Sequence, residues 1–166
     1  MSEMTKAYPG EQLRPEEVLR LAEVYRHAAE LLRAELRKKK AGGRGSSFSH
    51  APWRLLAVHA IELYLNALLL KAGHAPEAVR GMQHQFESKS KVAAGSGIVL
   101  DSKTKSHLSR MQESREYLLT RYDPERGRKL SEINRLERTL SELAKNAGSK
   151  IGAGKTGLPP SKKLAV

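Results

Sequence analysis

The residues with the clearest potential for chemistry lie in one long apolar segment, WRLLAVHAIELYLNALLLK at residues 53–71. Its interior polar residues are His59, Glu62 and Asn66, and their spacing of three and then four residues places them along one narrow stripe of a helix. A buried carboxylate next to a histidine can position a nucleotide or transfer a proton. Buried polar groups must also find hydrogen-bonding partners, so the simpler interpretation is a satisfied network that fixes how this helix packs.

Polar residues later in the chain are the candidate partners of this stripe. We expect His84, Arg115 or Arg121 to face Glu62 and to form a polar pocket with it. Arg121 and Tyr122 also suit a ligand, since a guanidinium can bind a phosphate through two hydrogen bonds and a tyrosine ring can stack on a base. The alternative is structural: Tyr122 continues the core-facing stripe of its helix, and Arg121 pairs with Glu62.

Two further patterns give less support for a site. His59 and Glu62 lie one helical turn apart and could bind a metal ion, but a third ligand such as His84 has no support from spacing. The run GAGKTG at residues 152–157 matches a dinucleotide-binding pattern only in its letters, because two prolines soon follow where a helix is required. We therefore predict no metal and no cofactor. The remaining histidines are expected at the surface or in loops: His27, His50, His74 and His107.

The segment that carries the polar stripe must lie inside the protein, because its apolar residues cover nearly the whole circumference of a helix. Pro52 and Gly73 are typical of a helix start and a helix end. The sequence therefore predicts a central helix between these two residues. It would be enclosed by other helices of the chain or shared with a second subunit.

A first amphipathic helix is expected before the central one. Pro15 and the acidic residues after it start this helix, it ends near Lys40, and a flexible connection follows from Gly42 to Ala51. The apolar residues recur at spacings of three and four, so they define one inward face. That face is expected to comprise Val18, Leu21, Ala22, Tyr25, Ala28, Ala29, Leu32 and Leu36.

Helical patterns continue after the central helix. Pro76 starts a short turn, a helix with Phe86 and Ala93 facing inward runs from about residue 83 to 94, and another follows the cap Asp101 as far as residue 122. A last helix carries an apolar stripe over residues 130–143. No alternating run of β-branched residues indicates a strand. The predicted fold is therefore all-α, a bundle of four to five helices.

The domain organisation follows from the same patterns. We predict a flexible arm over residues 1–13, one helical domain over residues 14–145, and a basic, flexible tail over residues 146–166, where glycine, proline and lysine replace core residues.

The composition restricts the partners and the location. The net charge is +12, and a basic surface of this kind attracts nucleic acid or anionic lipid. An equally good interpretation is that the basic residues only solvate the helix ends and the tail. The chain has no cysteine and its N-terminus has no apolar signal segment, so we expect a cytoplasmic protein. A carboxylate in the middle of the central helix argues against a membrane span.

The order of several motifs resembles that of the HEPN family, the helical domains named for higher eukaryote and prokaryote nucleotide binding. AIELYLNALLLKAG at residues 60–73 is similar to the family's AxExxLKAxLxxxG helix, and His84-Gln85-Phe86 is similar to the His-Asp-Leu that opens its next helix. Tyr117 with LLTRYDP at residues 118–124 resembles the family's tyrosine, spacer and Arg-Tyr ending. The resemblance covers residues 15–145. It implies an antiparallel up-and-down bundle, usually a homodimer.

The chain departs from the family pattern at several positions. Asn66 stands where a lysine is usual, and Gln85 where an aspartate is usual. Catalytic members carry an arginine followed four to six residues later by a histidine near the fourth helix. Here Arg121 has no such partner, because no histidine occurs after His107. The resemblance therefore points away from ribonuclease activity.

The resulting prediction is a HEPN-like binding or accessory module without ribonuclease activity, whose partner is a nucleotide, RNA or a nucleotidyltransferase. The candidate ligand-binding residues are His59, Glu62, Asn66, His84, Arg115, Arg121 and Tyr122. One alternative is a metal-independent, toxin-like endoribonuclease that uses His59 or His84 with Arg121 across a dimer. A purely structural dimerisation module is the other.

Overall fold

The protein folds into α-helices throughout the part of the chain that is described. The computed structural model describes residues 10, 12–39, 47–125 and 130–152. Within these ranges no strand occurs, so the all-α prediction is confirmed. The described helices are α1 (Pro15–Lys39), α2 (Ser47–Lys71), α3 (Pro76–Gly81), α4 (Phe86–Gly95), α5 (Ser102–Glu113), α6 (Glu116–Tyr122) and α7 (Ile133–Ile151).

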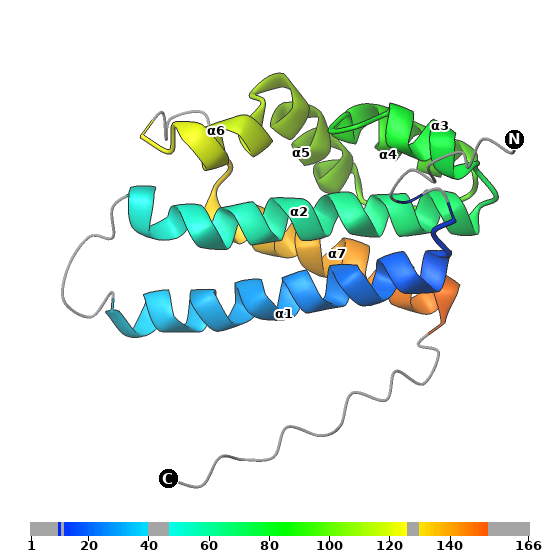
Figure 1. Ribbon diagram of the computed structural model, residues 1–166. Coiled ribbons are helices and arrows are strands. Elements are labelled where there is room, and N and C mark those ends of the chain that lie inside the picture. The colour runs from blue at the N-terminus through cyan, green and yellow to red at the C-terminus, as the bar shows by residue number, and fades with distance from the viewer. Residues whose placement is uncertain (1–9, 11, 40–46, 126–129, 153–166) are drawn as a thin grey trace, which may run out of the picture.

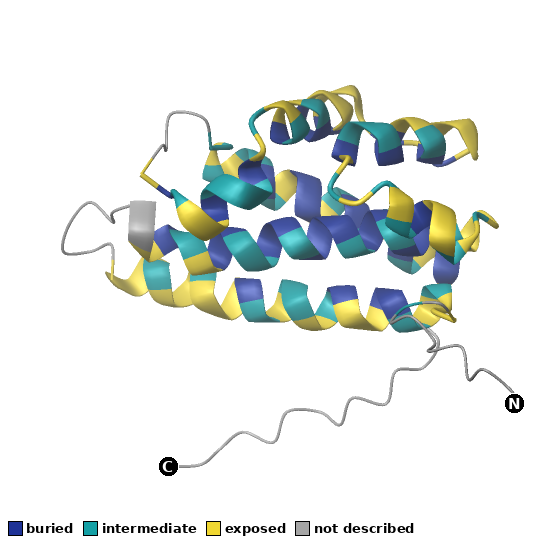
Figure 2. Cartoon of the chain, turned by 45° about the horizontal axis from the view of Figure 1, so that its top comes forward, coloured by how far each residue is buried: buried dark blue, intermediate teal, exposed yellow. Residues whose placement is uncertain are grey.

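Helix α2 lies at the centre of the fold, as its apolar composition predicted. It runs antiparallel to its neighbour α1, and α7 and the shorter helices cover its other sides (Figure 1). Ile61, Leu65 and Leu68 have no exposed surface, and the buried residues in Figure 2 concentrate along this helix. One stripe of α2 is partly exposed, and it comprises Leu56, His59, Leu63, Asn66 and Leu70. A single chain therefore encloses most of the central helix and removes most of its apolar surface from solvent.

The start of α2 differs from the prediction. The helix begins at Ser47, so Pro52 lies inside it, and residues 47–51 are helical where a connection up to Ala51 was expected. Proline removes one backbone hydrogen bond, but His50 and Trp53 on either side of it are buried and secure this turn by packing. The earlier part of the predicted connection, residues 42–46, lies outside the described residues.

The end of α2 agrees with the prediction. Gly73 has a φ of +93°, a conformation in which glycine meets no steric penalty. Its N–H donates to the Leu70 carbonyl at 3.0 Å, and the N–H of His74 donates to the Leu69 carbonyl at 3.1 Å. These two bonds satisfy carbonyls that a helix end leaves without partners, and they stop the helix.

Helix α1 buries most of the predicted face, and Tyr25 and Leu36 of that face are partly buried against the core. Val18, Ala22 and Ala29 are buried as expected, but Leu21 is 46% exposed and Leu32 is 36% exposed. Val24 and Leu31 are also exposed, at 53% and 57%. Apolar residues extend beyond the inward face of this helix, so periodicity alone did not show that Leu21 and Leu32 lie outside the core. A stripe of exposed apolar residues consequently remains on the outer side.

The helix predicted from Asp101 to residue 122 is two helices. The Asp101 side chain accepts a hydrogen bond from the Lys103 N–H at 2.7 Å, which confirms the predicted cap. Helix α5 then ends at Glu113, because Arg115 adopts a left-handed conformation with φ +52° and ψ +44°. Because of this turn, the residues of α6 do not continue the inward face of α5. Tyr122 is 77% exposed, so its predicted place in the core is wrong.

The other helices lie close to their predicted positions. Helix α3 begins at Pro76, and Phe86 and Ala93 of α4 are fully buried, as expected. Helix α4 begins at Phe86 rather than near Gln83, because Gln83 has a positive φ of 39°.

The last helix extends beyond the predicted domain boundary. Helix α7 continues to Ile151, so residues 146–151 belong to the folded domain and not to a tail. Ala147 and Ile151 are buried and continue the stripe of Leu143 at intervals of four residues. The rest of the predicted tail, residues 153–166, and most of the predicted N-terminal arm lie outside the described residues.

One described segment, Ser49–Lys71, is long and apolar enough to cross a membrane. Of its most apolar window, 67% is buried inside the protein. The core helix of a soluble protein meets the same criterion, so this finding is weak evidence for a membrane span. The absence of membrane contact and the cytoplasmic location stay predictions.

Candidate functional site

Three of the predicted ligand-binding residues line one open groove between α2 and α6. His59 comes from α2, and Arg121 and Tyr122 come from the last turn of α6. The groove has a volume of about 720 Å³. Its other lining residues are mainly apolar and aromatic: Tyr25, Ala51, Pro52, Leu55, Leu56, Thr120 and Pro124. An apolar floor with a few polar groups at its edge is typical of a ligand site.

The polar groups of this groove differ in their exposure. His59 is half-buried, and its ring meets the edge of Tyr25 with centroids 4.4 Å apart. Burial lowers the pKa of His59, and the charge of Arg121 lowers it further, although Glu62 acts in the opposite direction. His59 is therefore neutral at pH 7. Arg121 and Tyr122 are exposed, so a guanidinium and a phenol ring are available to a ligand.

Glu62 lies in a separate, buried network behind this groove. Its carboxylate is 2.9 Å from His84 Nδ1 and 3.1 Å from Lys89 Nζ. Lys89 is 1% exposed, and burial lowers its pKa. The His84 ring stacks on Tyr117 at a centroid distance of 4.1 Å. The structure thus brings Glu62 and His84 together, and this is one of the pairings that the sequence predicted for Glu62.

Lys89 is the partner of Glu62 that sequence reasoning missed. It lies on the inward face of α4 between Phe86 and Ala93, one helical turn from each. That periodicity was a usable signal, because a lysine on a buried face needs an anionic partner.

Arg115, Arg121 and Asn66 do not join the Glu62 network. Arg115 is exposed at the break between α5 and α6, and among the described residues Arg121 forms no ion pair with Glu62. Asn66 lies one turn further along α2, and its Oδ1 atom is buried without a hydrogen-bonding partner in the described structure. The predicted polar stripe is therefore divided into a groove at His59, a buried ion pair at Glu62, and an isolated amide.

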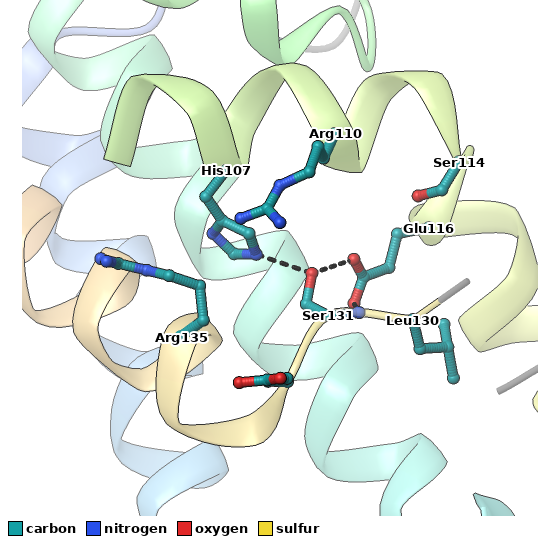
Figure 3. A pocket seen from close by; sticks show the side chains of 8 residues that line it. His107, Arg110, Ser114, Glu116, Leu130, Ser131 and Arg135 are labelled. Atoms are coloured by element: carbon teal, nitrogen blue, oxygen red, sulfur yellow. Dashed lines mark hydrogen bonds between the residues drawn. The ribbon is translucent and has the colours of Figure 1, made fainter. Parts of the chain in front are cut away.

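A second polar network lies between α5 and α7, around a residue predicted to be at the surface. His107 is 1% exposed, so that prediction is wrong, and the same holds for His50, which is 8% exposed. His107 Nε2 is 2.6 Å from Ser131 Oγ, and the Ser131 hydroxyl donates to Glu116 (Figure 3). Arg54 of α2 lies 3.4 Å from the same buried carboxylate.

The proton positions in this network follow from its donors and acceptors. The Ser131 hydroxyl donates to Glu116, so it accepts from His107 Nε2–H. His107 Nδ1, 2.8 Å from Thr139 Oγ1, is then the acceptor of the threonine hydroxyl. Burial first, and then the charges of Arg135 and Arg110, lower the pKa of His107 to about 4. The imidazole is therefore neutral.

This arrangement is not a nucleophile–base–acid triad. In a triad the carboxylate accepts from the histidine, whereas here Glu116 accepts from the serine, and burial raises its pKa. Ser131 is held on both sides and its hydroxyl hydrogen points away from the imidazole. The burial of His107 could have been predicted from the sequence, because His107 shares one helical face with Thr104, Leu108 and Met111.

No three His, Asp or Glu side chains come together as a metal site in the part of the chain that is described. No protein-family model, curated protein or solved structure matches this chain.

Proposed function

We propose that the protein is a HEPN-like binding module without ribonuclease activity, folded as an antiparallel up-and-down bundle, and that it binds RNA or a nucleotide in the groove between α2 and α6. The observation that carries this proposal is the 77% exposure of Tyr122 beside Arg121, at the mouth of an apolar groove. An exposed aromatic ring next to a guanidinium matches a base and its phosphate.

The charge of the chain supports the same ligand class. A net charge of +12 attracts polyanions from solution, while the groove supplies the stacking surface that charge alone lacks. The family resemblance also allows a nucleotidyltransferase as partner. The exposed Arg-Tyr pair favours RNA, because a base and a phosphate satisfy both side chains at once.

Fluorescence anisotropy with a labelled single-stranded RNA tests this proposal. We expect Tyr122→Ala and Arg121→Ala each to weaken binding about tenfold, since stacking on an aromatic ring contributes about 1–3 kcal/mol per base. Binding should also weaken steeply with salt. Arg138→Ala is the matched control, because Arg138 is also exposed, belongs to α7 and does not line the groove.

The outcomes separate the candidate functions. Unchanged affinity in both groove variants would refute the proposal. The endoribonuclease alternative is favoured by one observation, the neutral His59 in the same groove as Arg121. RNA cleavage by the wild-type protein that disappears in His59→Gln would establish that alternative, whereas RNA retained intact supports a binding module.

We also propose that the protein is a homodimer and that α1 forms the contact, since α2 is enclosed. Two copies of α1 packed antiparallel, centred between His27 and Ala28, would place Val24 against Leu31 of the other copy. The same register sets Arg20 opposite Glu35 and Glu17 opposite Lys38. Apolar contact along the middle and opposite charges at the ends favour this pairing. A dimer without RNA binding would support the structural alternative.

A further inference from the structure

A second pocket, distinct from the groove, lies between α5 and the start of α7. Its volume is about 340 Å³, and its lining includes His107, Arg110, Ser114, Ser131 and Arg135. Figure 3 shows Arg110 reaching from α5 beside the His107 ring, while Arg135 extends from α7 on the other side of that ring. Two cations from different helices thus line one small polar cavity.

Both guanidinium groups have unmet hydrogen-bonding capacity. Arg135 Nη2 donates to Thr104 Oγ1 at 3.2 Å and to Thr139 Oγ1 at 3.4 Å, which fixes the position of the group. Its Nε atom is buried and has no acceptor among the described residues. The Arg110 guanidinium has no hydrogen bond or ion pair with any described side chain and lies close enough to His107 to lower its pKa. A buried donor such as Arg135 Nε requires an acceptor.

The described residues that line the pocket supply no such acceptor. The Glu116 carboxylate already accepts from the hydroxyl and the N–H of Ser131, and Arg54 compensates its charge. Glu132 is the other acidic residue of the lining, and it is exposed. His107 is neutral and its two nitrogens are occupied by Ser131 and Thr139. The free groups of the pocket are therefore donors.

We propose that this pocket binds a phosphate group, held by the guanidinium groups of Arg110 and Arg135. A tetrahedral oxyanion presents acceptors in several directions, so it can accept from donors on two different helices, and arginine is the residue best suited to it. The phosphate is either a free inorganic ion or part of a polynucleotide. The proposal does not depend on the groove at Tyr122.

Titration of the full chain with inorganic phosphate tests the pocket. The NMR signals of the His107 ring report binding, and sodium chloride keeps the ionic strength constant. We expect a saturable shift in the wild-type protein and at least a tenfold weaker affinity in Arg110→Gln and Arg135→Gln. Glu132→Gln should strengthen binding, because it removes the one carboxylate that is not paired within the lining. Arg138→Gln is the matched control.

Each outcome bears on the proposal. Arg110 is exposed, so its substitution leaves the fold intact even if Arg135→Gln disturbs the turn around Thr139. No saturable shift in the wild-type protein, or equal affinity in wild-type protein, Arg110→Gln and Arg138→Gln, would refute the pocket. A second arm with single-stranded RNA identifies the source. If Arg110→Gln lowers the affinity for RNA, the pocket binds a phosphate of a polynucleotide. If Arg110→Gln weakens phosphate binding but leaves the affinity for RNA unchanged, the pocket binds the free ion.

Discussion

Single residues in this protein obtain their properties from partners that are distant in the sequence. His107 meets Ser131 and Thr139, which follow it by 24 and 32 residues, and Glu62 meets His84 and Lys89 after 22 and 27. The sequence placed His84 among three expected partners of Glu62, because only a few polar residues were available to a buried carboxylate. It did not predict the environment of His107, since its partners are ordinary hydroxyl residues without any pattern.

The buried His107 makes the stability of the protein depend on pH. Its pKa is about 4 in the folded protein and about 6.5 in the unfolded chain, so the unfolded chain takes up a proton first as the pH falls. The free energy of unfolding should therefore be constant above about pH 7 and fall by about 1–2 kcal/mol between pH 7 and pH 5. Burial raises the pKa of Glu116, and this contribution to the pH dependence has the opposite sign, because the folded protein holds that proton more tightly than the unfolded chain does.

Urea unfolding at several pH values measures this effect. In His107→Gln the free energy of unfolding should lose the part of its pH dependence that comes from His107. The pKa of His59 is also lowered, but His59 contributes equally in the wild-type protein and in this variant. His27→Gln, at an exposed position of α1, is the control and should follow the wild-type curve. A wild-type stability that rises from pH 7 to pH 5 would contradict the neutral state of His107.

At the scale of elements, the sequence predicted what local signals encode. Periodicity located α1, α2 and α7, and short-range signals located the cap at Asp101 and the end of α2 at Gly73. The break at Arg115 has no such signal, because a non-glycine residue in the left-handed region is stabilised by its surroundings and not by its type. The exposed position of Tyr122, and with it the open groove, depends on that break.

Arg115→Gly tests the break directly. In the left-handed conformation of Arg115, glycine avoids a steric penalty, so we expect the free energy of unfolding to rise by about 0.5–1 kcal/mol. In an uninterrupted helix the same change would lower it by a similar amount. Lys105→Gly, at an exposed position inside α5, is the control and should be destabilising. The sign of the Arg115→Gly change in thermal unfolding thus distinguishes two helices from one.

At the scale of the whole molecule, the outer side of α1 is the surface that remains to be explained. A chain with an enclosed core does not need exposed leucine and valine along one stripe, although single exposed apolar residues are common. The sequence predicted a homodimer through family resemblance, and that expectation stays a proposal. The structure assigns α2 to the interior, so an interface between copies requires another face.

Light scattering of purified protein at high concentration tests the α1 contact. We expect a dimer that dissociates in the double variant Val24→Glu with Leu31→Glu, because two charges would be buried in an apolar contact. Val99→Glu is the control, since Val99 is 81% exposed and belongs to the connection between α4 and α5. Arg20→Glu should weaken the dimer, and adding Glu35→Arg should restore it. A wild-type protein that is monomeric would contradict the contact.

The carboxylate of Glu116 joins three segments that are far apart along the chain. It contacts Arg54 of α2 and both the hydroxyl and the N–H of Ser131, just before α7. During synthesis, a chain that has emerged from the ribosome only as far as α6 contains Arg54 and Glu116 but not yet Ser131. Cooperative folding of the domain therefore awaits the last helix, and a ribosome-bound intermediate that lacks it should stay accessible to proteases.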